Sequence, residues 1–142
     1  MKARVTLITL GVDDLKRSKA FYSKLGFVAS KQGTEDVAFF PLSGGAVLSL
    51  YRRAYLFRDA GLKDEGARFS GITLAHNTST PAEVNEIAAA FTAAGGTIVK
   101  APHDVFWGGY IAYVADPDGH VWEIAHNPGW GLEADGGLRL PS

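Results

Sequence analysis

A single carboxylate lies between bulky apolar residues in the stretch ADPDGHVWEIAHNP, residues 115–128. The turn at residues 116–119 has proline second and glycine fourth, which is typical of a type I turn followed by a glycine bulge. A hairpin with that turn places Glu123 opposite Tyr113 on the same face of the sheet. A carboxylate can act as a general base next to a phenol that donates a proton or stabilises an oxyanion. Glu123 and Tyr113 are therefore our candidate catalytic residues.

The length of the turn decides which face Tyr113 occupies. A two-residue turn would shift the pairing by one residue and move Tyr113 to the core side of the sheet. The bulged turn is favoured because Pro117 suits its second position and Gly119 its left-handed position. With that register, Trp122 packs under the covering helix and belongs to the core.

The four histidines do not form a recognisable catalytic set. His76 and His126 are predicted near the ends of neighbouring strands on the face opposite Glu123, where we expect structural hydrogen bonds rather than a metal. His103 lies in a loop and His120 follows the turn, and neither has a visible partner for nucleophilic or proton-relay chemistry. Because the chain has no cysteine, a thiolate zinc site and a cysteine nucleophile are excluded.

The elements that position these residues follow one order twice. In the first half, a β-branched strand precedes a helix whose apolar residues recur at helical spacing. Asp13 or Asp14 can cap the start of this helix, and Gly26 ends it. The first half is predicted as strand 5–12, helix 15–25, and strands 27–31, 36–42 and 46–52.

The second half repeats the order of the first. Thr80, Pro81 and Glu83 form a capping box with proline at the first helical position. The helix ends at the glycine pair 95–96. The second half is predicted as strand 71–76, a helix from residue 80, and strands 97–101, 109–115 and 120–126.

Local sequence similarity supports an internal duplication. LITLGV at residues 7–12 superposes on GITLAH at residues 71–76, and Ser49 in VLSLY superposes on Glu123 in VWEIA. Similarity at a fixed period is the mark of repeated modules that share one sheet. We therefore predict a single domain, residues 1–142, of two βαβββ repeats at about 4–52 and 70–127, with a connector at 53–69 and a tail at 128–142.

The connector and the tail carry the remaining apolar residues. RAYLFRDAG in the connector predicts a helical turn whose Tyr55, Leu56 and Phe57 are too apolar to lie free in water. The glycine-rich tail has Trp130 as its only large anchor, so we expect it to wrap a partner surface or to fray.

Composition excludes several classes of partner. The chain of 142 residues has 14 Lys plus Arg against 15 Asp plus Glu, a formal charge of −1, so no long-range attraction to nucleic acid is expected. No apolar run reaches the roughly 18 residues that a membrane helix needs, and we expect the N-terminal residues to form a strand rather than a signal peptide. We expect a cytoplasmic protein that binds neither nucleic acid nor membrane.

The motifs VDDLKRSKAFYSKLGF and DPDGHVWE, with the two βαβββ copies, resemble the vicinal oxygen chelate superfamily. This superfamily includes glyoxalases, extradiol dioxygenases, and bleomycin and fosfomycin resistance proteins. The resemblance implies an α+β fold in which two tandem βαβββ modules form a curved mixed sheet with a concave cavity. It also implies a homodimer, because dimerisation usually completes that cavity.

Metal-dependent members of that superfamily take ligands from the first and fourth strands of each module. Carried over, those positions are Leu7, Ser49, Gly71 and Glu123, of which only the last is a metal ligand. A catalytic divalent ion needs at least three protein ligands in most sites. We therefore expect no metal and no cofactor at this position.

Alternation along the strands predicts the lining of the cavity. The lining is mostly apolar and aromatic with a few hydroxyls, which suits an organic ligand better than a charged metabolite. Residues 106–109, FWGG, add an aromatic loop that could stack on a planar ligand or close one end of the barrel. The predicted ligand-binding residues are Leu7, Thr9, Phe39, Ser49, Tyr51, Thr73, Trp107, Tyr113 and Glu123.

Three functions are compatible with these residues. The first is a metal-free small-molecule-binding protein of the glyoxalase/bleomycin resistance type that sequesters an apolar or aromatic compound. The second is a lyase, isomerase or dioxygenase-type enzyme on the same scaffold, with Glu123 as base or as sole remaining metal ligand. The third is an interaction module whose cavity is filled by its own large side chains.

Overall fold

The chain folds as two compact units that divide inside the predicted connector. The computed structural model describes residues 1–66 and 68–141. We call Met1–Arg68 unit 1 and Phe69–Ser142 unit 2. Residue 67 of the predicted connector and residue 142 of the predicted tail lie outside the described residues. Both units pack helices on a sheet of mixed strand direction, which confirms the predicted α+β class.

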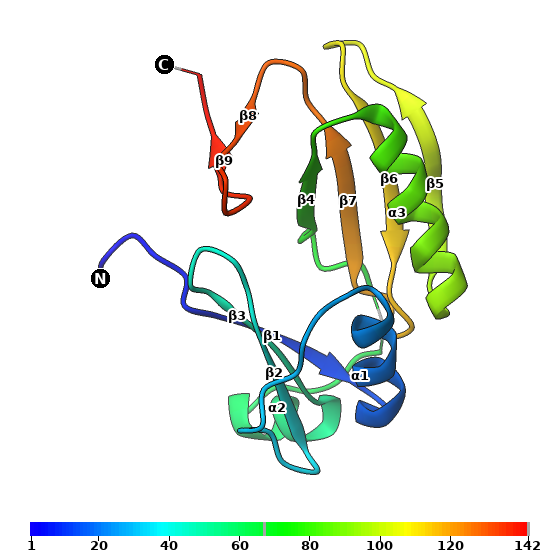
Figure 1. Ribbon diagram of the computed structural model, residues 1–142. Helices are drawn as coiled ribbons and strands as arrows, with labels where there is room; N and C mark the ends of the chain where they lie inside the picture. The colour runs from blue at the N-terminus through cyan, green and yellow to red at the C-terminus, as the bar shows by residue number, and fades with distance from the viewer. Residues whose placement is uncertain (67, 142) are drawn as a thin grey trace. The chain divides into compact units, whose positions relative to one another are not determined.

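Unit 1 has a three-stranded sheet with β3 at its centre (Figure 1). The strand β3 pairs in parallel with β1 and antiparallel with β2. The elements of unit 1 are β1 (Leu7–Val12), α1 (Leu15–Lys24), β2 (Val37–Pro41), β3 (Val47–Arg52) and α2 (Arg53–Ala60).

The helix α1 begins and covers the sheet as its sequence predicts. Asp14 is the N-cap, and its carboxylate accepts a hydrogen bond of 3.0 Å from the backbone N–H of Arg17. Phe21 and Tyr22 are buried, and the Tyr22 ring lies 6.1 Å from that of Phe40 on β2. The apolar side of α1 therefore forms the core of unit 1.

The strand predicted at residues 27–31 is absent, and this prediction was wrong. The N–H of Phe27 donates to the carbonyl of Tyr22 at 3.1 Å, so the segment begins still bound to the end of α1. A hydrogen bond to β2 runs from the N–H of Ser30 to the carbonyl of Phe39 at 2.7 Å. The Phe27 ring packs against Tyr22 of α1 and Phe40 of β2, and the segment does not pair as a strand of the sheet.

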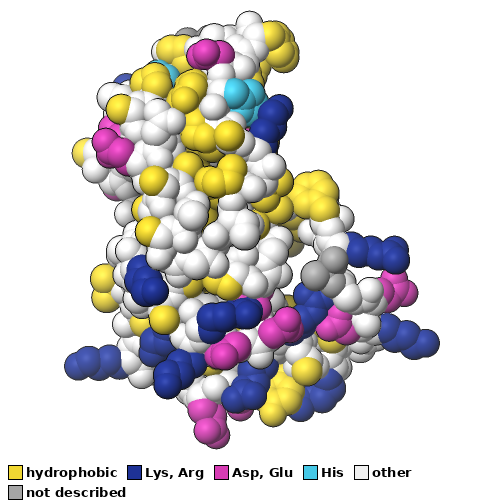
Figure 2. Space-filling model, turned by 90° about the vertical axis from the view of Figure 1, so that its right-hand side faces the viewer, with side chains coloured by type: hydrophobic (Ala, Val, Ile, Leu, Met, Phe, Trp, Pro, Cys, Tyr) yellow, Lys and Arg dark blue, Asp and Glu magenta, His cyan; other side chains and the backbone are white. Residues whose placement is uncertain are grey.

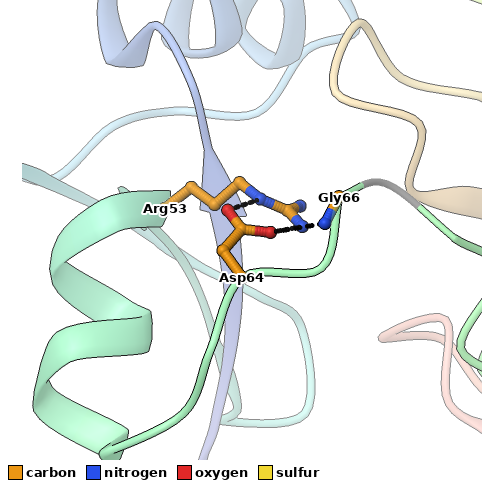
Figure 3. Close-up of polar contacts among 3 residues, drawn as sticks. All are labelled: Arg53, Asp64 and Gly66. Carbon is orange, nitrogen blue, oxygen red and sulfur yellow. Dashed lines mark hydrogen bonds and ion pairs between the residues drawn. The ribbon is translucent and has the colours of Figure 1, made fainter.

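The predicted helical turn of the connector is the helix α2, which an ion pair joins to the loop that follows it (Figure 3). The Arg53 guanidinium donates to both carboxylate oxygens of Asp64 at 2.6 Å, and the N–H of Gly66 donates to the same carboxylate at 3.0 Å. These donors lower the pKa of Asp64 to about 2. Leu56 of α2 packs over Gly11, where a Cβ would lie 3.3 Å from its methyl carbon.

Unit 2 has a four-stranded sheet in the order β4-β7-β6-β5, with α3 on one face (Figure 1). The pair β4 and β7 is parallel, and the other two pairs are antiparallel. A short hairpin of β8 (Gly131–Leu132) and β9 (Leu138–Arg139) follows the sheet. The main elements are β4 (Leu74–Thr78), α3 (Pro81–Ala94), β5 (Thr97–Asp104), β6 (Tyr110–Ala115) and β7 (Val121–His126).

The capping box predicted for α3 is present. The Thr80 hydroxyl accepts from the N–H of Glu83 at 3.3 Å, and the Glu83 carboxylate accepts from the N–H of Ser79 at 3.1 Å. Gly95 ends the helix with a φ of 111°. Trp122 faces this helix, its ring 6.2 Å from that of Phe91, so the prediction that it belongs to the core is confirmed.

The start of β4 and the C-terminal tail differ from the prediction. The strand β4 begins at Leu74 rather than at Gly71, because Gly71 has a φ of 79°, which an extended strand does not allow. In the tail, Trp130 remains 43% exposed. The described part of the tail instead forms the β8-β9 hairpin.

Among the described residues, no helix combines the length and the apolar character needed to cross a membrane.

Candidate functional site

The pair formed by Tyr113 and Glu123 is the most chemically capable contact of unit 2. The Tyr113 hydroxyl donates a hydrogen bond of 2.5 Å to Glu123 Oε2. The two residues are directly opposite each other on β6 and β7, and both are half-buried. A hydrogen bond to a carboxylate is stronger than one between neutral groups, so this pair fixes both side chains on one face of the sheet.

The register of this pair comes from the turn between β6 and β7. The N–H of Asp116 donates to the carbonyl of His120 at 3.0 Å, and Gly119 has a φ of 87°. The Asp116 carboxylate accepts from the N–H groups of Asp118 and His120, both at 2.9 Å. The predicted bulged turn is thereby confirmed, together with the pairing of Tyr113 with Glu123.

The face of the unit 2 sheet that carries this pair is opposite the face covered by α3, and we call it the open face of unit 2. Ile111 and Ala125 flank the pair on the same face and are buried, whereas Val121 is half-buried. Next to Glu123, the strand β4 contributes Ala75. The predicted ligand residue Thr73 precedes β4 and is exposed. A carboxylate and a phenol therefore lie in mostly apolar surroundings.

The hydrogen bond to Glu123 raises the pKa of Tyr113, and burial and the negative charge of the carboxylate raise it further. The phenol therefore keeps its proton around neutral pH and acts as a hydrogen-bond donor. Among the described residues, no second donor reaches the Glu123 carboxylate. Its other oxygen can accept a hydrogen bond from a ligand.

Five predicted ligand residues lie on one face of the unit 1 sheet, opposite the face that α1 covers. Thr9, Ser49 and Phe39 are neighbours across the three strands, and Ser49 is only 2% exposed. At one end Leu7 is exposed, and at the other the Tyr51 hydroxyl donates to Asp59 of α2 at 2.8 Å. We call this surface the open face of unit 1.

Trp107 lies in the loop between β5 and β6, outside the paired rows of the open face of unit 2. The loop closes with a bond of 2.9 Å from the N–H of Gly108 to the carbonyl of Val105. The Trp107 ring lies against Gly109, where any Cβ would overlap it, and is 44% exposed. The neighbouring Phe106 is fully exposed, and hydrophobic side chains gather on the visible surface of unit 2 (Figure 2).

Matching the helix N-caps of the two units, Asp14 and Thr80, corrects the alignment of the repeats. The strand pairing agrees with this match, because Thr9 pairs with Ser49 in unit 1 and Ala75 pairs with Glu123 in unit 2. The second-repeat residue that matches Leu7 is consequently Thr73, two residues beyond the Gly71 that sequence similarity selects.

The residues present do not fit the metal that the resemblance implies. Among the described residues, no three His, Asp or Glu side chains come close enough together to hold a metal ion. Thr73 replaces Gly71 at the corrected position, but a neutral hydroxyl adds little to a single carboxylate. We derive no chemical step through a metal.

The two strand histidines lie on the covered side of the sheet, as predicted. His126 contacts the carbonyl of Thr78 through Nδ1 at 3.3 Å, which is a structural contact beside α3. His76 pairs with Ile124 on the same side, and burial lowers its pKa although much of its side chain stays exposed.

The contribution of β5 to the open face of unit 2 was not predicted from the sequence. The predicted strand ended at residue 101, whereas β5 continues to Asp104 and contains two irregularities in its pairing with β6. These place Lys100 beside Tyr113 and His103 beside Ile111. No signal in the sequence indicates where a strand will bulge.

Unit 1 also has a polar cleft that the sequence did not predict. Its volume is about 400 Å³, and it lies beside the start of α1. Charged side chains of both signs cover the visible surface of this unit (Figure 2). The cleft is lined by Asp13, Asp14, Leu15, Lys16, Lys19, Thr34, Glu35 and Arg52.

The fold and the sequence identify the class of the protein. The sequence model of the Glyoxalase/Bleomycin resistance protein/Dioxygenase superfamily matches residues 4–124, and the chain belongs to this superfamily. The predicted resemblance is thereby confirmed.

Several solved structures are similar to the chain. A glyoxalase-related enzyme from Fulvimarina pelagi is 34% identical, with 99% of each chain covered and a TM-score of 0.87. A glyoxalase/bleomycin resistance protein/dioxygenase from Nocardioides is 26% identical, with 89% of this chain and 84% of that chain covered and a TM-score of 0.70. Lactoylglutathione lyase from Agrobacterium tumefaciens shares the fold at 24% identity, with 94% of this chain and 100% of that chain covered and a TM-score of 0.68. Among the curated proteins, none matches.

Proposed function

We propose that the protein binds a small apolar or aromatic molecule on the open face of unit 2, with Glu123 and Tyr113 as its polar contacts. The observation that carries this proposal is the half-buried hydrogen bond of 2.5 Å between the two side chains. Ligand sites are mostly apolar and place a few polar groups to fix orientation, and this face has that composition. Glu123 would accept a hydrogen bond from the ligand, and Ile111 would contact its apolar body.

The open face of unit 1 offers the same kind of surface without a charged group. We extend the proposal to its lining residues, which would contact apolar parts of a ligand or accept a single hydrogen bond. Tyr51 contributes its ring, because its hydroxyl is bound to Asp59. The proposed contacts of unit 1 are Leu7, Thr9, Phe39, Ser49 and Tyr51.

A thermal-shift and native mass spectrometry screen of aromatic compounds tests the proposal. A ligand at 100-fold excess over its Kd adds about 2.7 kcal/mol to the free energy of unfolding. We expect aromatic compounds to raise Tm and to form complexes of defined stoichiometry. The proposal is wrong if no aromatic compound shifts Tm while a divalent metal shifts it strongly.

Matched variants locate the site. Glu123→Gln keeps the shape of the side chain and removes its charge, so a ligand that donates to the carboxylate should bind about tenfold more weakly. Glu86→Gln makes the same change on the exposed side of α3 and should leave Kd unchanged. Tyr110→Phe is the control for Tyr113→Phe, because Tyr110 lies on the same strand but bonds Asn85 of α3.

A second candidate function is enzymatic, and the glyoxalase-related enzyme from Fulvimarina pelagi favours it. Glu123 would remove a proton next to a substrate carbonyl, and the carboxylate would hold that proton. The Tyr113 hydroxyl would turn from Glu123 to donate to the developing oxyanion. Turnover of hemithioacetals or catechols that disappears in Glu123→Gln supports this function. The absence of turnover in both the parent protein and this variant contradicts it.

We also propose that the protein is a homodimer located in the cytoplasm. Light scattering during gel filtration tests the first part, and a mass of one chain at micromolar concentration would contradict it.

A further inference from the structure

The strand β5 changes its facing within a few residues. It pairs with β6 with one register shift between Ile98 and Lys100, and a second between Lys100 and His103. Side chains alternate along a regular strand, so residues 98 and 100 would otherwise share a face. Because of the first shift, Ile98 pairs with Val114 on the covered face, whereas Lys100 pairs with Tyr113 on the open face. Bulges of this kind re-aim side chains and are common next to functional sites.

The amino group of Lys100 has no acidic partner among the described residues. In contrast, Arg52, Arg53 and Arg58 of unit 1 each pair with an aspartate. The Lys100 side chain is exposed, and directly opposite residues in an antiparallel pair have Cβ atoms roughly 5 Å apart. A lysine side chain is long enough to reach the surroundings of the Tyr113 hydroxyl from that position.

We propose that Lys100 is an anion-binding residue of the open face of unit 2, and that the ligand is an organic acid with an apolar or aromatic body. This inference rests on the proposed function and specifies its ligand class. The ligand carboxylate would pair with Lys100, and a donor elsewhere on the ligand would bind Glu123. Without Lys100, the Glu123 charge would repel such an acid, so the lysine is required for this preference.

Binding of 6-hydroxy-2-naphthoate and 6-hydroxy-2-naphthamide by the full chain tests the inference, because both compounds carry a hydroxyl donor for Glu123 and they differ mainly in charge. We expect the acid to bind roughly tenfold more tightly, since hydrogen bonds between charged groups are the stronger ones. Lys100→Gln should abolish this preference and leave the Kd of the amide unchanged. Lys100→Arg should retain it. Lys31→Gln removes the same charge from an exposed site of unit 1 and should have no effect.

Calorimetry gives the affinities, and amide shift perturbations in NMR spectra give the location. If the acid and the amide bind equally, or if Lys100→Gln weakens both alike, the inference about Lys100 is wrong and the proposed function stands. If the acid binds better but perturbs only unit 1, the inference is also wrong. If neither compound binds at millimolar concentration, the proposed function fails together with the inference.

Discussion

The two open faces have the same pattern of pairing and different chemistry. On the open face of unit 1, Phe39 pairs with Ser49 as Tyr113 pairs with Glu123 on the open face of unit 2. The aromatic ring is retained at both positions. The phenol and the carboxylate occur only in the second pair, where they form a hydrogen bond of 2.5 Å.

The two positions also differ in burial. Ser49 is 2% exposed, so a carboxylate at that position would lose its hydration without a partner in place. Glu123 is half-buried, and the Tyr113 hydroxyl compensates for part of its lost hydration. A duplicated scaffold can therefore keep its geometry while only one copy keeps the groups that do chemistry.

The largest effect is expected from transferring the carboxylate to unit 1. Ser49→Glu should lower the free energy of unfolding by about 3–5 kcal/mol, as for an unpaired charge in a buried site. Adding Phe39→Tyr should recover about 1 kcal/mol by supplying the hydrogen bond. Urea denaturation measures both changes. A loss near 0.5 kcal/mol, typical of an exposed site, would contradict the comparison.

A smaller effect is expected when the hydroxyl is removed from unit 2. Tyr113→Phe makes this pair resemble that of unit 1 and should lower the free energy of unfolding by about 1 kcal/mol. Phe39→Tyr alone gains no carboxylate partner and should not increase stability. If Tyr113→Phe is as stable as the parent protein in urea denaturation, the hydrogen bond to Glu123 does not stabilise unit 2.

The titration of Tyr113 also distinguishes the two units. Its pKa is raised above the ordinary 10.0, so the stability from its bond to Glu123 is present below pH 10 and is lost as the pH rises through the raised pKa. In Glu123→Gln the tyrosinate absorbance should appear at lower pH. The titration of Tyr51, whose pKa Asp59 raises in unit 1, should stay unchanged in this variant.

The smallest effect concerns the ion pair that joins α2 to its following loop in unit 1. Asp64 has a pKa of about 2 against an ordinary 3.8. Its contribution to the free energy of unfolding is therefore complete above pH 3.8 and is lost as the pH falls toward 2. Asp64→Asn should remove this part of the decrease in stability at low pH. Carboxyl NMR titration checks the pKa, and Glu65→Gln is the neighbouring control.

The sequence predicted most helices and strands because their signals are local. Asp14 and Thr80 cap helices through hydrogen bonds to N–H groups within three residues. The segment at residues 27–31 shows the limit of this approach. It has the composition of a strand, but the end of α1 binds its first N–H group and Phe27 packs into the core.

The candidate site was predictable in part for the same reason. The pairing of Tyr113 with Glu123 followed from two turn residues, Pro117 and Gly119, which restrict the backbone regardless of the rest of the fold. The role of Lys100 was not predictable, because a bulge depends on how the neighbouring strand pairs. For Leu7, Thr9, Phe39, Ser49, Tyr51, Thr73 and Trp107, the role as ligand contacts stays a prediction.

The sequence alone determined the superfamily, the order of most elements and the register of the last hairpin, because these depend on composition, caps and turn geometry. Only the tertiary structure decided where β4 begins, which residue of the second repeat matches Leu7, and which side chain of β5 faces Tyr113. Each of these is a matter of pairing between strands. The energy of that pairing is shared between residues far apart in the chain, so no local pattern records it.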